Sequence, residues 1–169
     1  MKYSMWAFCI YIFVSFNSLI AGDIDGFWKN VNEKTGRPGI IVSIYEYEGK
    51  RYGRILGSYD SDGAIDDTIY AASSRARGVK GNPFYSGLDF IWNLSKKGAR
   101  YKGKIMDPRK GKTYDVELWT QNGQLVVRGE ILFFGRNEYW NPAKESDFSA
   151  TFQKPDVNTF VPVIPEAIE

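Results

Sequence analysis

The side chains that could do chemistry in this 169-residue chain are mainly carboxylates, because it has no histidine and a single cysteine. Without histidine, the chain cannot form a Ser-His-Asp triad, a Cys-His dyad, a histidine general base or a His-ligated zinc site. Cys9 has no second cysteine with which to form an intrachain disulfide. The remaining possibilities are carboxylate pairs, which hydrolyse glycosides, and clustered aspartates, which bind calcium.

The densest group of aspartates is Asp60-Ser61-Asp62-Gly63, with Asp66 and Asp67 behind it. An EF-hand loop needs glycine at its sixth position and glutamate at its twelfth. Here glycine is fourth, and the twelfth residue is Ala71. We therefore expect a solvated turn and no metal site.

Glutamates that could take part in acid–base catalysis are Glu46, Glu117 and Glu130. Side chains alternate between the two faces of a strand, so Glu117 must point away from Val116 and Leu118, toward solvent. The sequence therefore predicts no catalytic residues and no cofactor, and we expect a protein that is not an enzyme. A carboxylate-dependent enzyme is the minor alternative.

Residues 1–21 have the features of a secretory signal peptide. Lys2 precedes an apolar stretch from Trp6 to Phe16, and the small residue Ala21 stands before Gly22. The apolar stretch is well short of the ~20 residues needed to span a bilayer. We expect cleavage before Gly22, a secreted or periplasmic protein, and no stable membrane span afterwards.

The charge of the mature chain is nearly balanced. Lys2 is one of 22 basic residues, so 21 basic residues remain against 20 acidic ones, a net charge of +1. Nucleic acids and anionic membranes both attract proteins with a concentrated basic excess. The sequence therefore predicts neither as a partner.

The mature chain consists of short runs rich in Val, Ile, Tyr, Phe and Trp, separated by Gly, Asn, Asp and Pro. This texture, with its period of two, is typical of antiparallel strands joined by tight turns. Asn122-Gly123 is the strongest two-residue hairpin signal. We predict strands at Gly26–Asn30, Gly39–Glu48, Arg51–Tyr59, Leu88–Leu94, Arg100–Met106, Thr113–Thr120, Gln124–Leu132 and Glu138–Trp140.

The alternation also assigns faces to these strands. Tyr101, Gly103 and Ile105 share one side of their strand, and lysines occupy the other, so the first side should be covered. A Gly-x-Ile pattern recurs at Gly53, Gly103 and Gly129. Glycine relieves crowding where a sheet coils sharply. The pattern predicts an all-β fold: a small up-and-down antiparallel β-barrel of about eight strands.

Gly26-Phe27-Trp28 opens the first predicted strand, and an Asp-Pro-x-x-Gly-Lys-x-Tyr turn runs from Asp107 to Tyr114. The first motif is similar to the Gly-x-Trp start of lipocalin-like (calycin) barrels. Together the two motifs, of which the turn is the more specific, resemble an uncharacterised family of exported bacterial proteins with such a barrel. The resemblance extends roughly from Asp25 to Trp140. It implies the fold and the compartment, and it implies no enzymatic activity.

We expect three parts: the signal peptide at 1–21, the barrel at 22–141 and a proline-containing tail at 142–169, with Phe148, Phe152 or Phe160 packed on the barrel. The connection from Asp60 to Asn82 is long enough to be a functional lid or an insertion. A barrel of eight strands is either filled by its own side chains or holds one small ligand.

The first hypothesis is a small, largely apolar ligand held in or at the mouth of the barrel. The alternative is a filled barrel that acts through its surface as a cell-envelope or host-facing interaction module. The candidates for a ligand cavity are strand aromatics, which provide contact area: Trp28, Phe90, Trp92, Tyr101, Tyr114 and Trp140.

Overall fold

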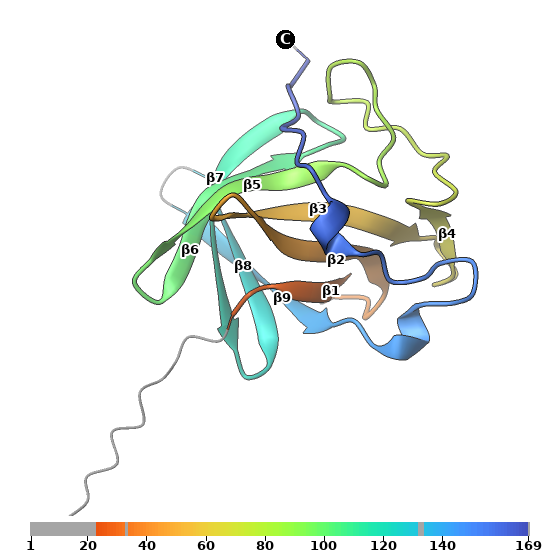
Figure 1. Cartoon of the computed structure of the whole chain (residues 1–169), viewed down its shortest axis with the longest axis horizontal. Coiled ribbons are helices and arrows are strands. Elements are labelled where there is room, and N and C mark those ends of the chain that lie inside the picture. Colours follow the sequence, from red (N-terminus) through yellow and green to blue (C-terminus); the bar gives the residue numbers. More distant parts are fainter. Residues whose placement is uncertain (1–22, 33, 132–133, 169) are drawn as a thin grey trace, which may run out of the picture.

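The computed structural model describes residues 23–32, 34–131 and 134–168, with the backbone alone at 130, 131 and 134. Nine strands form one sheet (Figure 1). They are β1 Gly26–Val31, β2 Pro38–Tyr47, β3 Lys50–Tyr59, β4 Ile65–Thr68, β5 Asp89–Lys97, β6 Arg100–Asp107, β7 Lys112–Gln121, β8 Gln124–Ile131 and β9 Phe134–Pro142. The predicted signal peptide lies outside the described residues.

The sheet closes into a barrel of eight antiparallel strands. β1 pairs with β2 on one side and with β9 on the other, β2 also pairs with β3, and β3 pairs with β5. The predicted all-β, up-and-down antiparallel barrel of about eight strands is confirmed. The ninth strand, β4, forms a short hairpin with β3 outside the circle and was not predicted from the sequence.

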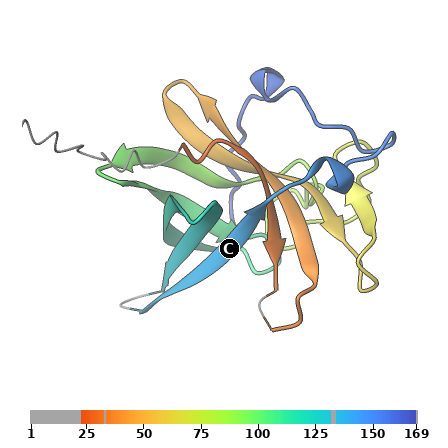
Figure 2. The same ribbon diagram turned by 90° about the horizontal axis from the view of Figure 1, so that it is seen from below.

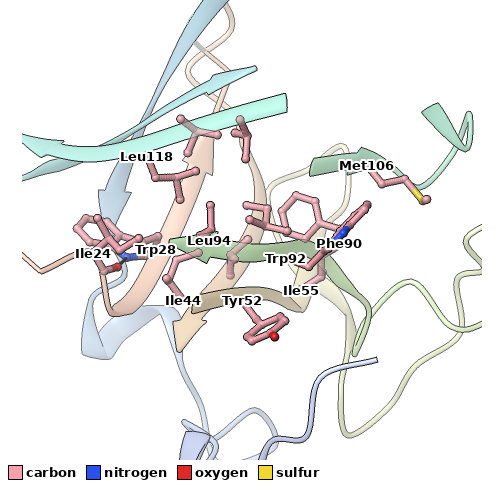
Figure 3. Packing of buried hydrophobic residues seen from close by; sticks show 14 of the residues in the cluster. Ile24, Trp28, Ile44, Tyr52, Ile55, Phe90, Trp92, Leu94, Met106 and Leu118 are labelled. Atoms are coloured by element: carbon pink, nitrogen blue, oxygen red, sulfur yellow. Dashed lines mark hydrogen bonds between the residues drawn. The ribbon is translucent and has the colours of Figure 1, made fainter. Parts of the chain in front are cut away.

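Every predicted strand is present, and the predicted faces explain the core. Tyr101 pairs with Leu118 and Gly103 pairs with Val116, and the side chains of these inward rows are almost fully buried. Figure 3 shows the packing of the buried cluster around Trp28, Leu94 and Leu118. A closed barrel has no free edge, and its alternate residues must fill the interior.

Glycine at 103 marks a close approach of two strands. A Cβ atom there would lie 2.6 Å from the carbonyl oxygen of Trp92 and 3.0 Å from Cα of Leu94. At Gly53 a Cβ would lie 2.9 Å from Cβ of Ile91, whereas Gly129 has open space. Two of the three Gly-x-Ile positions therefore allow tight curvature that a larger residue would obstruct.

The C-terminal segment covers the outer face of β2 and β3 (Figure 2). It contains two short 3-10 helices, η1 Glu145–Asp147 and η2 Val157–Thr159. Phe152 is buried in a second apolar cluster with Ile41 and Leu56, and Phe148 and Phe160 pack against that cluster. The three phenylalanines of the tail therefore cover an outer wall of the barrel.

No helix in the described ranges is long and apolar enough to cross a membrane.

Candidate functional site

An open cavity of about 680 Å³ occupies the end of the barrel where β6 turns into β7. Its residues come from the β1–β2 connection, from the ends of β3, β5, β6 and β9, and from the long segment between β4 and β5. The lining includes Asn30, Ile40, Ser58, Tyr59, Ser74, Arg75, Tyr85, Phe90, Ile105, Met106, Asp107, Arg109, Arg136, Glu138 and Trp140. The cavity is therefore a cup at the mouth of the barrel.

The floor of the cup is apolar and partly aromatic. The rings of Phe90 and Trp140 stack with their centroids 6.3 Å apart and an angle of 18° between their planes. Ile105 and Met106 from β6 and Ile40 from β2 extend this surface. Offset stacking of aromatic rings with aliphatic neighbours presents a broad apolar contact area to a small molecule.

Polar side chains on β9 enter the barrel at its mouth. Trp140, Glu138 and Arg136 are alternate residues opposite Leu125, Val127 and Gly129 on β8, so all three share the inward side. Glu138 accepts hydrogen bonds from Trp140 Nε1 at 3.3 Å and from Asn30 Nδ2 at 3.1 Å. The inward side chains of β9 therefore change from apolar at the floor, Trp140, to charged at the rim, Arg136, within five residues.

The segment between β4 and β5 is held at the rim by a buried carboxylate. Asp67 is fully buried and accepts hydrogen bonds from the backbone N–H groups of Ser73 and Ser74 and from the hydroxyls of Ser73 and Ser86. Burial alone would raise the pKa of Asp67, but these hydrogen bonds outweigh it and hold the pKa below its usual value. Asp67 thereby fixes the residues that follow it, among them the rim residues Ser74 and Arg75.

Asp60, the first of the clustered aspartates, closes a turn. Its Oδ1 accepts hydrogen bonds from the backbone N–H groups of Asp62 and Ala64, each at 2.9 Å. Asp67 points into the protein and is engaged by serines. The predicted solvated turn is therefore correct for Asp60 but wrong for Asp67, which is buried in β4 because serines satisfy its carboxylate.

The other end of the barrel is filled. Ile44, Leu94 and Leu118 are completely or almost completely buried there, and the indole of Trp28 donates to the carbonyl of Ile24 at 2.9 Å. Arg51 closes this end, with its guanidinium 5.0 Å from the centre of the Tyr101 ring and its Nε 3.1 Å from Asp25 Oδ1. One half of the barrel is thus packed, and the other half is a cup.

Two of the six predicted cavity residues line the cup, and four do not. Phe90 and Trp140 line the cup. Trp28, Trp92 and Tyr101 are buried in the core and are not part of the lining, and Tyr114 is half-buried and also outside it. That any of these residues contacts a ligand stays a prediction.

Sequence reasoning missed the polar rim. Arg136 and Glu138 could have been found from their alternation with Trp140, once that tryptophan was assigned to the interior. Arg75 and Tyr85 belong to the segment between β4 and β5, which has no strand pattern from which to place them.

Two charged residues, Arg54 and Glu117, lie on the outer face of the barrel but are covered there. Arg54 binds the buried Asp89 through Nε at 2.9 Å and Nη2 at 2.7 Å, and its guanidinium lies 4.3 Å from the Phe160 ring of the tail. Glu117 was expected in solvent, but it is buried to 7% exposure between Arg100 and Lys102. Its ion pairs hold its pKa below the usual value, mainly through hydrogen bonds from Lys102 and Arg100.

The residues that form the barrel match a known protein family. Residues 26–142 match the family described as an uncharacterized protein conserved in bacteria, DUF2147. The chain belongs to this family. The DUF2147 match begins at the first residue of β1 and ends at the last residue of β9, so it covers the closed barrel and excludes the tail.

A solved structure of similar fold is protein HP1028 from the human pathogen Helicobacter pylori, which is described as belonging to the lipocalin family. It is 20% identical to this DUF2147 protein, with a TM-score of 0.61, and the alignment covers 80% of this chain and 94% of that one. This likeness shows the fold. The search of curated proteins gives no match.

Proposed function

We propose that this DUF2147 protein is exported and binds a small, largely apolar molecule at the mouth of its barrel. The observation that carries the proposal is the cup of about 680 Å³ with the stacked Phe90 and Trp140 on its floor. Binding sites for small molecules are concave and mostly apolar, with a few polar groups that orient the ligand. The volume lies within the usual range of about 300–1,000 Å³ for such sites.

The polar groups at the rim suit a ligand with an apolar body and a polar end. The body would lie on Phe90, Trp140 and Ile105, and the polar end would face Asn30 or Arg136. The packed half of the barrel leaves no room below Trp28, so a ligand would enter only the outer half.

The first experiment is native mass spectrometry of the protein purified from its own host. The proposal predicts a chain that begins near Gly22 and carries a bound mass that is released when the protein unfolds. A chain that retains residues 1–21 and is recovered in the inner membrane would contradict export.

A fluorescent probe tests the cup directly. N-phenyl-1-naphthylamine should bind with a stoichiometry near one and change tryptophan emission, because Trp140 forms part of the floor. Replacing Ile105→Gln should weaken binding about tenfold, as expected when an apolar contact of roughly 1.5 kcal/mol is lost. Ile65→Gln is the matched control, since Ile65 lines a separate hollow between β4 and the tail.

Two outcomes would reject the site. Equal binding by wild type and Ile105→Gln, with weaker binding by Ile65→Gln, would place the probe in the outer hollow. Absence of saturable binding would favour the second candidate, a barrel that acts through its surface as an interaction module.

A further inference from the structure

A basic patch forms where two segments that are distant in sequence meet at the barrel mouth. Gly78 of the β4–β5 segment donates its N–H to the carbonyl of Pro108 at 2.9 Å. A Cβ on Gly78 would lie 2.1 Å from the backbone nitrogen of Gly111, so glycine permits this contact. Six exposed cations lie within three residues of Gly78 or Gly111 in the sequence, and we call them the basic patch: Arg75, Arg77, Lys80, Arg109, Lys110 and Lys112.

Two carboxylates of the described part of the chain lie close to cations of the basic patch. Glu166 pairs with Lys80 at 3.0 Å, and Asp107 lies 3.7 Å from Arg109 Nε. Among the described residues, six cations against these two carboxylates leave an excess of four positive charges. The near-neutral whole chain therefore concentrates positive charge at one place, contrary to the expectation from its composition.

An apolar ridge adjoins the basic patch. Among the described residues, six large hydrophobic side chains are exposed, and five of them lie here. Val163 and Val161 are 71% and 61% exposed. We call these five residues the apolar ridge: Phe84, Val161, Val163, Ile164 and Ile168. The first four line an open groove of about 580 Å³ beside Lys80.

Backbone hydrogen bonds hold the ridge against the patch. Lys80 N donates to the carbonyl of Glu166 at 2.8 Å, and Ile168 N donates to that of Gly78 at 3.1 Å. Val163 N donates to the buried Asp89 Oδ2 at 2.9 Å. Figure 1 shows the end of the chain beside the β4–β5 segment at the top of the view. The tail is therefore fixed in place with its apolar side chains outward.

We propose that the basic patch and the apolar ridge together dock the protein on an anionic lipid bilayer. Apolar side chains that enter the headgroup region and cations that face lipid phosphates are the two components of interfacial membrane binding. An exposed apolar cluster on an otherwise soluble barrel indicates an interaction surface. The surface lies beside the cup but does not depend on what the cup binds.

The charge pattern favours a bilayer over other partners. A nucleic acid would use the cations but would leave the five apolar side chains in water. A second copy of this chain, joined ridge to ridge, would bring two basic patches together at a cost from like-charge repulsion. A lipid surface satisfies both components at once.

Vesicle co-sedimentation tests the proposal with phosphatidylcholine vesicles and with vesicles that contain about one third phosphatidylglycerol. We expect binding to the anionic vesicles alone, and its loss at about 0.5 M salt, where charges are screened. A cation near an anionic leaflet strengthens binding roughly fivefold, so the double variant Arg77→Gln/Lys110→Gln should bind about thirtyfold more weakly. Val163→Ser/Ile164→Ser should also weaken binding.

The matched control is Lys50→Gln/Lys97→Gln, which removes two exposed lysines from the turns at the closed end. Its binding should stay within about twofold of wild type if the patch is responsible. All variants share the same N-terminus, so residues 1–22 contribute equally to every measurement. The substituted side chains are exposed, so circular dichroism and urea unfolding should match wild type.

Four outcomes would overturn the proposal. The first is no binding of the wild type to anionic vesicles, and the second is an equal loss of binding in the control variant Lys50→Gln/Lys97→Gln. The third is unchanged vesicle binding by Val163→Ser/Ile164→Ser together with displacement of the protein from vesicles by DNA. The fourth is a wild-type dimer in sedimentation velocity that Val163→Ser/Ile164→Ser dissociates.

Discussion

The two ends of the barrel are built from the same strands, but one end is packed with side chains and the other is open. At the closed end, inward positions carry Trp28, Ile44 and Leu118, and almost no side-chain surface is accessible. At the mouth, inward positions carry Asn30, Arg136 and Glu138 around an open cup. The backbone pairing continues through both halves, so the side chains that the strands and their bulges turn inward decide which half is filled.

This difference indicates which positions of a small barrel can change without loss of stability. The closed half supplies most of the hydrophobic stabilisation, because its aromatic and aliphatic side chains are removed from water. The mouth contributes less burial and can tolerate polar residues that interact with a ligand. Substitutions at the two ends should therefore have very different effects on stability.

The largest effect is expected at the closed end. Trp28→Ala should lower the free energy of unfolding by roughly 3–5 kcal/mol, the usual loss for a buried large aromatic residue. It also removes the hydrogen bond to the carbonyl of Ile24. Urea titration measures the loss. Trp119→Ala, on the half-buried outer face, is the control and should cost about 1 kcal/mol.

A loss below about 1 kcal/mol for Trp28→Ala would mean that this indole contributes no more than a surface residue. The contrast between a packed end and an open end would then be wrong.

A smaller, pH-dependent effect is expected at Asp67, which anchors the rim segment. At pH 6, Asp67→Asn should destabilise the protein by about 2 kcal/mol, the scale of hydrogen bonds to a charged group. The folded pKa of Asp67 is lowered, so its contribution is full above the unfolded pKa of about 3.9 and is lost as pH falls through the folded pKa.

Urea titrations of wild type and Asp67→Asn between pH 6 and pH 3 measure this change. The difference between the two proteins should shrink below about pH 4. Other carboxylates cancel, because both proteins carry them. A difference that is constant across this range would show that the charge of Asp67 does not stabilise the segment.

The smallest effect on stability is expected at the mouth. Arg136→Gln should change the free energy of unfolding by less than about 0.5 kcal/mol, because the side chain is exposed and forms no ion pair with a described residue. The same urea titration provides the value. A loss above about 1 kcal/mol would make Arg136 part of the framework and would remove the contrast between the ends.

The fold could be predicted from the sequence because strand alternation and turn signals are local. The alternation of Tyr101, Gly103 and Ile105 with lysines identifies the inward face of this strand without information about the neighbouring strands. β4 escaped prediction because its four residues include Asp66 and Asp67, which are unfavourable in strands. The burial of Asp67 depends on serines in the following segment, and only the folded chain shows them.

The site could be predicted only in part, because its residues depend on irregularities in pairing. The register between β3 and β5 shifts between Gly53 and Arg54, and that between β5 and β6 shifts between Trp92 and Ser95. Such bulges move side chains off a strict alternation. Phe90 consequently reaches the cup while Trp92 does not, although a regular strand would place both on one face.

The pairing of β1 with β9, which closes the barrel, affects how the chain folds. Only three residue pairs join β1 to β9, and the first of them links Trp28 to Pro142. Contacts between such distant residues slow folding, because a long loop must be closed before they form. Until β9 is present, β1 and β8 each have one unpaired side. A chain synthesised from its N-terminus therefore forms an incomplete sheet first. Its unpaired strand edges can pair with other chains until β9 covers them.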